Sequence, residues 1–286
     1  MRIIYTCLTV WLLVFSVSIT VAQEPVIIGK LRSSALTEVS GITASVYNSK
    51  VFFVHNDSGD RSAIYAIDNE ARLVATVELE GVTLVDVEDI ATLRIDETPY
   101  LLLADIGNNL RDRDTLSLFL FKEPVLEQGR DNYRVPADQI QEIRFRYKDK
   151  RRDAEALFVD PVDNMIYIIS KRDFKSTVFG LSFSSLQKEI VHELEPQMQL
   201  PLTFVTAADI RQDGGFILIK NLTSVFLWER KKGQDLISAL KGAFKKIPYK
   251  IEPQGEAICF DRNDRFFYTI SERPFGLDAY LYKYDY

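Results

Sequence analysis

The sequence predicts an all-β fold, and within that class a five-bladed β-propeller; a six-bladed ring is the alternative. Three observations support five blades. A short motif recurs five times, each copy opens a series of short strand-like runs, and the closing aliphatic residues lie 48, 67, 53 and 48 residues apart. The copies are Glu38–Ile42, Asp86–Ile90, Asp153–Leu157, Thr206–Ile210 and Gln254–Ile258.

Residues 1–22 have the pattern of a signal peptide. Arg2 gives a positive start, residues 3–21 are almost wholly apolar, and small residues precede a cleavage point near Ala22 and Gln23. The alternative is an uncleaved membrane anchor, because the apolar run approaches the length of a bilayer span. We expect residues 23–286 to form one propeller domain, secreted or periplasmic, monomeric, and without a membrane span after cleavage.

Composition excludes several classes of function. Removing residues 1–22 takes away one of 35 basic and none of 41 acidic residues, which leaves a net charge of −7 and argues against binding a nucleic-acid polymer. Only Cys259 then remains, so no intrachain disulfide can form. With only His55 and His192 present, a histidine-rich zinc site is not expected.

Alternation and β-branched residues place the strands, and Asn, Asp, Gly and Pro mark the turns. The strands expected in the first two units are Val39–Ala44, Lys50–Val54, Ala63–Ile67, Leu73–Leu79, Val87–Leu93, Tyr100–Ala104, Leu116–Phe121 and Ile140–Tyr147. A polar insert, Lys122–Asp138, delays the last of these and explains the one long spacing.

The third and fourth units continue this pattern, with a predicted helix near the end of the fourth. Their strands are expected at Ala154–Val159, Met165–Ser170, Thr177–Leu181, Ile190–Leu194, Thr206–Ile210, Gly215–Lys220 and Ser224–Trp228. The segment Gln234–Phe244 has leucines and a phenylalanine four residues apart, which predicts a helix on the flank of the ring.

The fifth unit is one strand short. It offers Glu256–Phe260, Arg265–Ile270 and Ala279–Tyr284, whereas Val26–Lys30 at the N-terminus has no hairpin partner nearby. We expect Val26–Lys30 to pair in the last blade and close the ring, because closure removes exposed sheet edges.

The first strand of each propeller blade lies innermost, so the repeated motif predicts a column of side chains on the axis. Its members are Ser40, Glu88, Glu155, Ala208 and Glu256. Three carboxylates that converge need protons or a cation, and an all-oxygen ring suits calcium. We therefore predict a calcium site formed by Ser40, Glu88, Glu155 and Glu256. The alternative is that lysines and arginines neutralise the glutamates.

The turns between second and third strands should surround this column on the same face. Asp57, Asp105 or His55 is then a candidate general base. Basic residues of this rim are candidates to hold an anion and its developing charge, namely Lys171, Arg172, Lys220 and Arg273.

Two resemblances attach to these residues. The segments His55–Asp60, Ala104–Asn109, Asp153–Pro161 and Gln254–Ile258 resemble a family of uncharacterised exported bacterial propeller proteins, which implies no particular reaction. The central column also resembles that of the five-bladed calcium-activated nucleotidases (soluble apyrases), which implies an axial calcium ion. Ala208 departs from that scheme, where an oxygen-bearing side chain is expected.

Three functions follow as hypotheses. The first is a metal-dependent hydrolase of a small anionic ester or phosphoanhydride, in which the ion activates water or the scissile group. The second is a non-catalytic propeller that binds a small anionic ligand, a protein or a glycan, with a structural ion. A glycoside hydrolase that uses two axial glutamates is the third. The first two remain open at this level.

Overall fold

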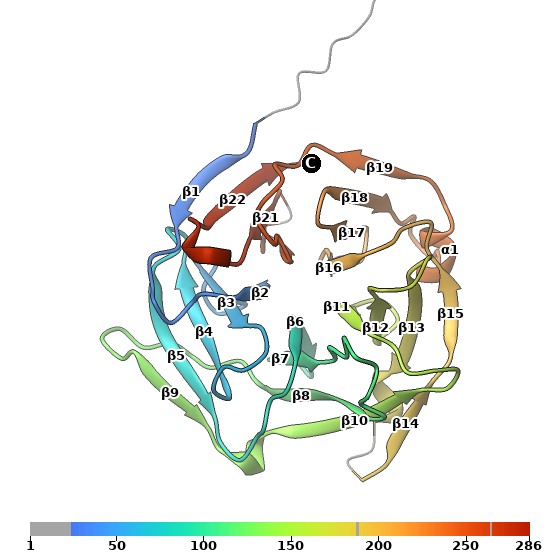
Figure 1. The fold of residues 1–286 in the computed structure, drawn as a ribbon, viewed down its shortest axis with the longest axis horizontal. Helices are drawn as coiled ribbons and strands as arrows, with labels where there is room; N and C mark the ends of the chain where they lie inside the picture. The colour runs from blue at the N-terminus through green and yellow to red at the C-terminus, as the bar shows by residue number, and fades with distance from the viewer. Residues whose placement is uncertain (1–23, 187–188, 264) are drawn as a thin grey trace, which may run out of the picture.

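The computed structural model describes residues 24–286 except 187–188 and 264, and in this part of the chain five sheets stand around a common axis (Figure 1). The predicted five-bladed β-propeller is confirmed. The predicted signal peptide, residues 1–22, lies outside the described residues. Among those that are described, no helix is long and apolar enough to cross a bilayer.

Each blade begins with an innermost strand near the axis and adds three antiparallel neighbours outward, and blades 1 and 2 add a fifth strand. Blade 1 holds β2 (Val39–Ala44), β3 (Val51–Asn56), β4 (Ala63–Asp68), β5 (Leu73–Leu79) and β9 (Asn132–Val135). Blade 2 holds β6 (Val87–Ile95), β7 (Thr98–Asp105), β8 (Leu116–Lys122), β10 (Gln141–Tyr147) and β14 (Val191–Leu194). Blade 3 holds β11 (Ala154–Asp160), β12 (Met165–Ser170), β13 (Thr177–Ser182) and β15 (Pro196–Gln199).

The last two blades have four strands each. Blade 4 holds β16 (Val205–Ile210), β17 (Phe216–Asn221), β18 (Ser224–Glu229) and β19 (Phe244–Ile247). Blade 5 holds β20 (Ala257–Phe260), β21 (Phe266–Ile270), β22 (Tyr280–Asp285) and β1 (Val26–Lys30). Because β1 pairs antiparallel with β22, the N-terminal strand completes the last blade as predicted.

Two outer strands belong to a different blade from the one the sequence order suggests. The predicted strand Ile190–Leu194 forms β14, which pairs parallel with β10 of blade 2, and Pro196–Gln199 supplies the fourth strand of blade 3 instead. Likewise the polar insert contains β9, which pairs parallel with β5 of blade 1. In both cases alternate residues are buried, so a strand from the next unit covers an otherwise open sheet edge.

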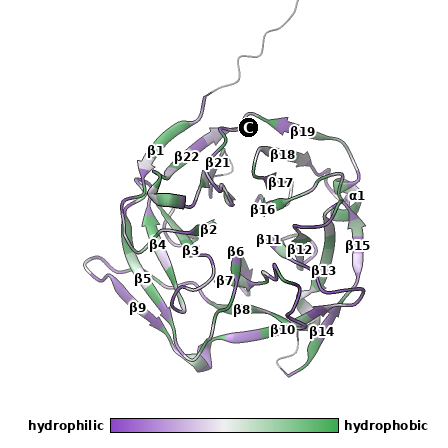
Figure 2. Cartoon of the chain, in the orientation of Figure 1, coloured by the Kyte–Doolittle hydropathy of each residue, from purple (hydrophilic) through white to green (hydrophobic). Residues whose placement is uncertain are grey.

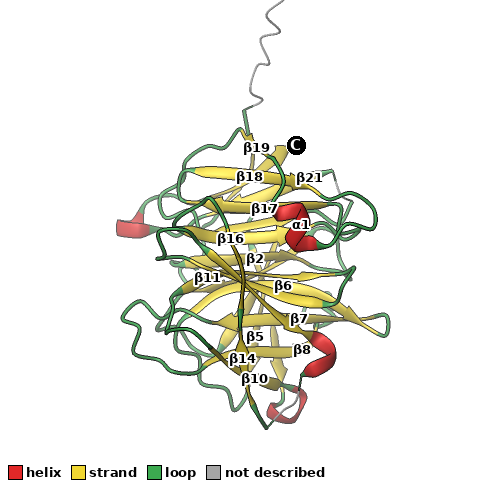
Figure 3. Ribbon diagram, turned by 90° about the vertical axis from the view of Figure 1, so that its right-hand side faces the viewer, coloured by secondary structure: helices red, strands yellow, loops and turns green. Residues whose placement is uncertain are grey.

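The predicted helix Gln234–Phe244 is shorter than expected. It spans only α1 (Leu236–Leu240), on the flank beside β18 (Figure 3), and Phe244 begins β19. Phe244 pairs with Trp228, and their ring centroids lie 4.7 Å apart. Its packing on the sheet therefore overrides the helical spacing of the leucines.

The hydrophobic core lies between blades rather than at the axis. Five clusters of buried side chains each join two neighbouring blades, and together they run around the ring. Hydrophobic residues accordingly line the strands of every blade, whereas the outer strands β9 and β19 carry hydrophilic ones (Figure 2). Burying a large apolar side chain contributes about 1.5–3 kcal/mol, so the clusters between blades supply the hydrophobic stabilisation of the ring. The residues on the axis can therefore be polar.

Candidate functional site

A β-bulge recurs where the innermost strands of blades 1 to 4 begin. In each blade one residue is skipped in the pairing with the second strand, and these residues are Ser40, Glu88, Glu155 and Thr206. In blade 5, Ala257 pairs with Ile270 as Ala156 pairs with Ile169, which makes Glu256 the equivalent of Glu155. A bulge can re-aim a side chain, so one position of the repeat is marked in blades 1 to 4, and Glu256 holds the equivalent position in blade 5.

This register corrects the predicted column in blade 4. The prediction placed Ala208 in the column, whereas the residue at the bulge is Thr206. The error arose because Ile210 was taken as the aliphatic end of the motif, while Ala208 occupies that place. Every blade therefore contributes an oxygen-bearing side chain to the column.

The two hydroxyls of the column connect neighbouring blades. Ser40 Oγ donates to the backbone carbonyl of Glu88 at 3.4 Å, and Thr206 Oγ1 donates to that of Gly255 at 3.5 Å. Each bond joins the starts of two innermost strands, which shows that these strands run in the same direction along the axis. We call the end of the axis where they begin the carboxylate end; it comprises Asp57, Asp86, Glu88, Asp153, Glu155 and Glu256.

A lysine neutralises one side of the carboxylate end. Lys171 Nζ pairs with Glu155 Oε1 and lies 3.1 Å from Glu256 Oε1. Burial lowers the pKa of Lys171, but the two glutamates outweigh it and the net shift is upward. The other oxygen of Glu155, Oε2, is buried and has no hydrogen-bond partner among the described residues.

On the other side of the carboxylate end, three carboxylates lie together without a direct ion pair, although the charges of Lys171 and Arg113 are near. Oxygens of Asp57, Asp86 and Glu88 lie within 4.8 Å of one another, and no ion pair of the described residues includes any of the three. Gly107 makes this approach possible, because a Cβ there would lie 2.3 Å from Glu88 Oε1 and 2.4 Å from the Asp86 carboxyl carbon. We call Asp57, Asp86 and Glu88 the acidic triad.

Proton affinity in the triad reflects both burial and mutual repulsion. Burial, followed by the neighbouring Asp57 charge, raises the pKa of Asp86 to about 6. Burial and the charges of Glu155 and Asp57 raise the pKa of Glu88 well above its ordinary value. The pKa of Asp57 is also raised, first by burial. A cation would relieve this cost, since opposite charge favours the ionised carboxylates.

Glu88 also belongs to a second acidic group. Its carboxylate, with those of Asp153 and Glu155, offers ligand atoms within 4.8 Å of one another. Asp153 already accepts a hydrogen bond from the Asn108 amide at 2.9 Å and pairs with Arg172 Nε at 2.7 Å. Glu88 is therefore the carboxylate shared by both groups.

Four of the five residues predicted to act in catalysis are held by hydrogen bonds or ion pairs within the protein. Asp105 is buried, accepts hydrogen bonds from the amides of Val85 and Asp86, and pairs with Arg113 at 2.7 Å. Arg273 Nη1 donates to the Ser33 carbonyl at 3.1 Å. The ammonium of Lys171 is held by glutamates, as described above. Asp57 is partly exposed, and of the five it is the residue that belongs to the triad.

His55 is the fourth of these residues. Its ring is buried with Nδ1 2.9 Å from the Asn56 carbonyl, so Nδ1 carries the proton. Nε2 has no hydrogen-bond partner among the described residues. A Cβ added to Gly41 would lie 2.1 Å from Nε2, so the ring packs directly against this glycine. Burial lowers the pKa of His55 to about 4, which keeps the ring neutral.

The sequence argument missed Asp86 and Asp153 as site residues. Both lie two positions before a bulge residue, in the pattern Asp-x-Glu of blades 2 and 3. Residues i and i+2 of a strand lie on one side of it, so this spacing was a usable signal. Asp57 was predicted as a general base, and the structure places its carboxylate beside those of Asp86 and Glu88.

Comparison with protein families and with curated proteins finds no match. Among solved structures, the chain is similar to an auxiliary nutrient binding protein from Bacteroides thetaiotaomicron, with a TM-score of 0.49 and 12% sequence identity. The match covers 86% of this chain and 58% of the other, so this chain spans less than two thirds of that protein's length.

Proposed function

We propose that this protein is a non-catalytic binding propeller whose carboxylate end holds a calcium ion. The observation that carries the proposal is the acidic triad: three carboxylates with raised pKa values lie within 4.8 Å of one another, two of them against Gly107, and none forms a direct ion pair among the described residues. Calcium takes six to eight oxygen ligands in irregular geometry, which matches an all-carboxylate donor set completed by water.

The proposed ligands come from blades 1 and 2. Asp57 follows β3, Asp86 precedes β6, and Glu88 lies within β6. The buried Oε2 of Glu155 in blade 3 is the nearest further candidate, because Glu155 shares the second acidic group with Glu88. In this arrangement Ser40 holds the backbone of Glu88, and Lys171 occupies the position next to Glu256. The ion would tie blades together.

The expected export of the protein determines how tightly the site must bind calcium. Calcium sites of extracellular modules have dissociation constants of about 10⁻⁴ to 10⁻³ M, so a site with only three or four carboxylates is sufficient outside the cell. A secreted or periplasmic location remains part of the proposal and depends on cleavage of residues 1–22.

Exposed apolar side chains around the carboxylate end favour a macromolecular partner. Leu110, Phe174 and Phe275 are almost fully exposed, and Phe204 is about half exposed. All four lie in loops on this face. Phe204 and Phe275 also have left-handed backbone conformations, with φ of 53° and 56°, which non-glycine residues rarely adopt. Such a face suits a protein or glycan better than an enclosed small molecule.

A metal-dependent hydrolase is the second candidate, and one observation favours it. Asp86 is partly exposed at the proposed ion site, and as a carboxylate it is suited to accept a proton from a water that the ion would hold there. Hydrolysis of phosphate esters, nucleotides or lactones that requires calcium and is abolished by Asp86→Asn would establish it. If no such substrate is turned over while calcium binds, the non-catalytic function stands.

Calcium binding is tested by isothermal titration of EDTA-stripped protein. We expect one ion per chain in the parent, and a loss of affinity of at least about 100-fold in Glu88→Gln, since one charged ligand is removed from the centre of the site. Asp112→Asn is the control, because Asp112 is exposed in the β7–β8 loop. Binding that is unchanged in Glu88→Gln, or equally weakened in Asp112→Asn, contradicts the proposal.

A further inference from the structure

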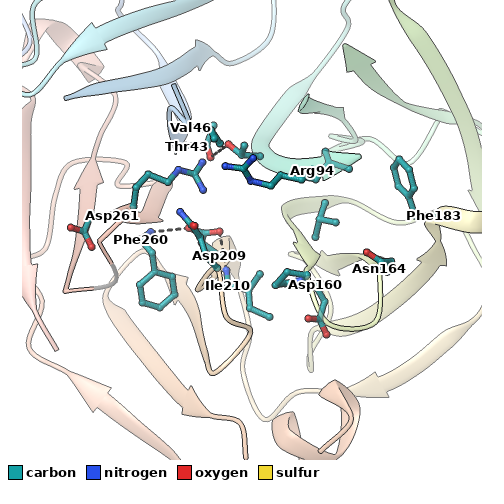
Figure 4. Close-up of a pocket in the computed structure, with 16 residues that line it drawn as sticks. Thr43, Val46, Arg94, Asp160, Asn164, Phe183, Asp209, Ile210, Phe260 and Asp261 are labelled. Carbon is teal, nitrogen blue, oxygen red and sulfur yellow. Dashed lines mark hydrogen bonds between the residues drawn. The ribbon is translucent and has the colours of Figure 1, made fainter. Parts of the chain in front are cut away.

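A pocket of about 280 Å³ lies at the opposite end of the axis, where the innermost strands finish (Figure 4). Its walls come from all five blades, for example Thr43 of β2, Thr92 of β6, Val159 of β11, Asp209 of β16 and Phe260 of β20. We call this the arginine end, because Arg94 and Arg262 both line it.

Arg262 crosses from blade 5 to blade 1. Its Nε donates to the carbonyl of Ala44 at 2.8 Å, and its Nη2 donates to the same oxygen. Burial lowers the pKa of its guanidinium, although the nearby charge of Asp209 opposes the shift. No ion pair of the described residues includes Arg262, and its side chain lines the pocket.

Arg94 brings a second guanidinium to the same space. It extends from the end of β6 into the pocket toward Thr43 (Figure 4), and its Nη1 donates to the Glu97 carbonyl at 3.0 Å. It too is absent from the ion pairs of the described residues. Two guanidinium groups at one pocket repel each other, and an anion between them would remove that cost.

The carboxylates that line the pocket have their own partners. Asp160 pairs with Arg230 at 2.5 Å, and Asp261 Oδ1 accepts from the Arg265 amide at 2.8 Å. Asp209 accepts from the amides of Ile210 and Phe260, each at 2.8 Å. The Arg230 guanidinium therefore neutralises Asp160, while Asp209 and Asp261 are held by backbone amides. Arg94 and Arg262 are held by backbone carbonyls, and the Asp209 charge lies near Arg262.

The rest of the pocket is suited to an apolar group. Val46, Val159, Pro161, Ile210 and the ring of Phe183 line the wall beside the arginines. Arginine recognises planar carboxylates with two parallel hydrogen bonds, and an apolar wall adds affinity for a hydrocarbon body. We propose that the arginine end binds a small organic carboxylate with a compact apolar body. This site is separate from the proposed calcium site and does not depend on it.

Calorimetric titration with three probes tests this proposal: benzoate, the neutral analogue benzyl alcohol, and inorganic phosphate. We expect benzoate to bind one per chain and at least tenfold more tightly than either other probe, because it alone has both features. Arg94→Gln and Arg262→Gln should each weaken benzoate by tenfold or more. Arg144→Gln is the control, since Arg144 is exposed on β10.

Two further measurements keep the outcome decisive. Val46→Phe fills the pocket without changing its charge, so it should weaken the binding of benzoate and of benzyl alcohol alike. Arg94 is exposed, so Arg94→Gln tests the contribution of charge even if Arg262→Gln fails to fold. The titrations are repeated in EDTA and in calcium. The proposal is overturned if benzoate binds no better than benzyl alcohol, if Arg94→Gln binds it like the parent, or if Glu88→Gln abolishes its binding.

Discussion

The two ends of the propeller axis are formed by the same five strands but hold different side chains around different kinds of space. At the carboxylate end, a bulge marks the same position of the repeat in blades 1 to 4, and acidic side chains crowd together beside Gly107. At the arginine end the innermost strands pair regularly, and Arg262 and other lining residues come from the turns that follow.

This difference separates two ways in which a repeat produces a site. A bulge at an equivalent position gives a symmetric column, which suits a spherical ion that many carboxylates can approach. Turn residues differ from blade to blade, and they give an asymmetric pocket, which suits an organic ligand with a polar and an apolar part. The predictions below alter one end and follow the other.

Closing the space beside Gly107 should have the largest effect. In Gly107→Ala the new Cβ meets the carboxylates of Glu88 and Asp86, so we expect calcium binding to be lost and stability to fall by about 2–3 kcal/mol through overpacking. Benzoate affinity should stay within twofold of the parent. Calorimetry and urea unfolding measure both; calcium binding that survives would show that the triad is not the site.

A carboxylate between the two ends should matter nearly as much for stability. Asp89 is buried and accepts from the amides of Ile90 and Leu157, each at 2.8 Å, which joins blades 2 and 3. Asp89→Ala leaves these donors unsatisfied and should cost about 2 kcal/mol in urea unfolding. Asp138→Ala, at an exposed position, is the control. A cost below about 1 kcal/mol would indicate that water replaces the carboxylate.

Acidity should change stability through the carboxylate end. Glu272 adjoins this end, because it accepts a hydrogen bond from Gln254 at 3.0 Å and lies near the charge of Glu256. The native pKa values of Asp86, about 6, and Glu272, about 7, are raised above those of the unfolded chain, in both cases first by burial. The native state then holds protons that the unfolded state releases, so without calcium stability falls as pH rises from about 4 to 7. Calcium binds the ionised form, and its stabilising effect should grow over the same window.

Thermal unfolding between pH 4 and 8, with EDTA and with calcium, measures this dependence. Asp86→Asn should flatten the EDTA profile near pH 6, whereas Arg94→Gln should leave its slope unchanged. A calcium effect of equal size at pH 5 and pH 7.5 would speak against ionised carboxylates as the ligands.

The smallest expected effect tests the corrected equivalence of the blades. Thr206→Val removes the hydroxyl that donates to Gly255, so we expect a loss of about 1 kcal/mol, as for one buried hydrogen bond. Ser40→Ala should have a similar cost, because its hydroxyl occupies the same position in blade 1. If urea unfolding shows no loss in either variant, the hydroxyls of the column do not hold the blades together.

The fold could be predicted well because its signals are local. Alternation placed most strands within two residues, and the spare strand Val26–Lys30 identified the closure. The parallel pairing of β9 and β14 could not be predicted, because a four-residue outer strand carries no sign of which blade it will join.

The site was predictable only in part. Acidic residues at repeated positions indicated the carboxylate end, but Ile210 was a more conspicuous aliphatic residue than Ala208 and shifted the register of blade 4. The roles of Lys171 and Asp57 depend on which carboxylate each reaches across the axis, and a sequence does not contain that distance. The arginine end was missed entirely, because Arg94 and Arg262 are distant in sequence and have no motif in common.

The most direct test of the central claim is thermal unfolding of residues 23–286 in EDTA and after calcium is restored, with Glu88→Gln beside the parent. The account predicts that calcium raises the melting temperature of the parent and leaves that of Glu88→Gln unchanged, since a ligand that binds only the native state stabilises it. If calcium changes neither melting temperature, or raises both equally, the carboxylate end does not hold the ion.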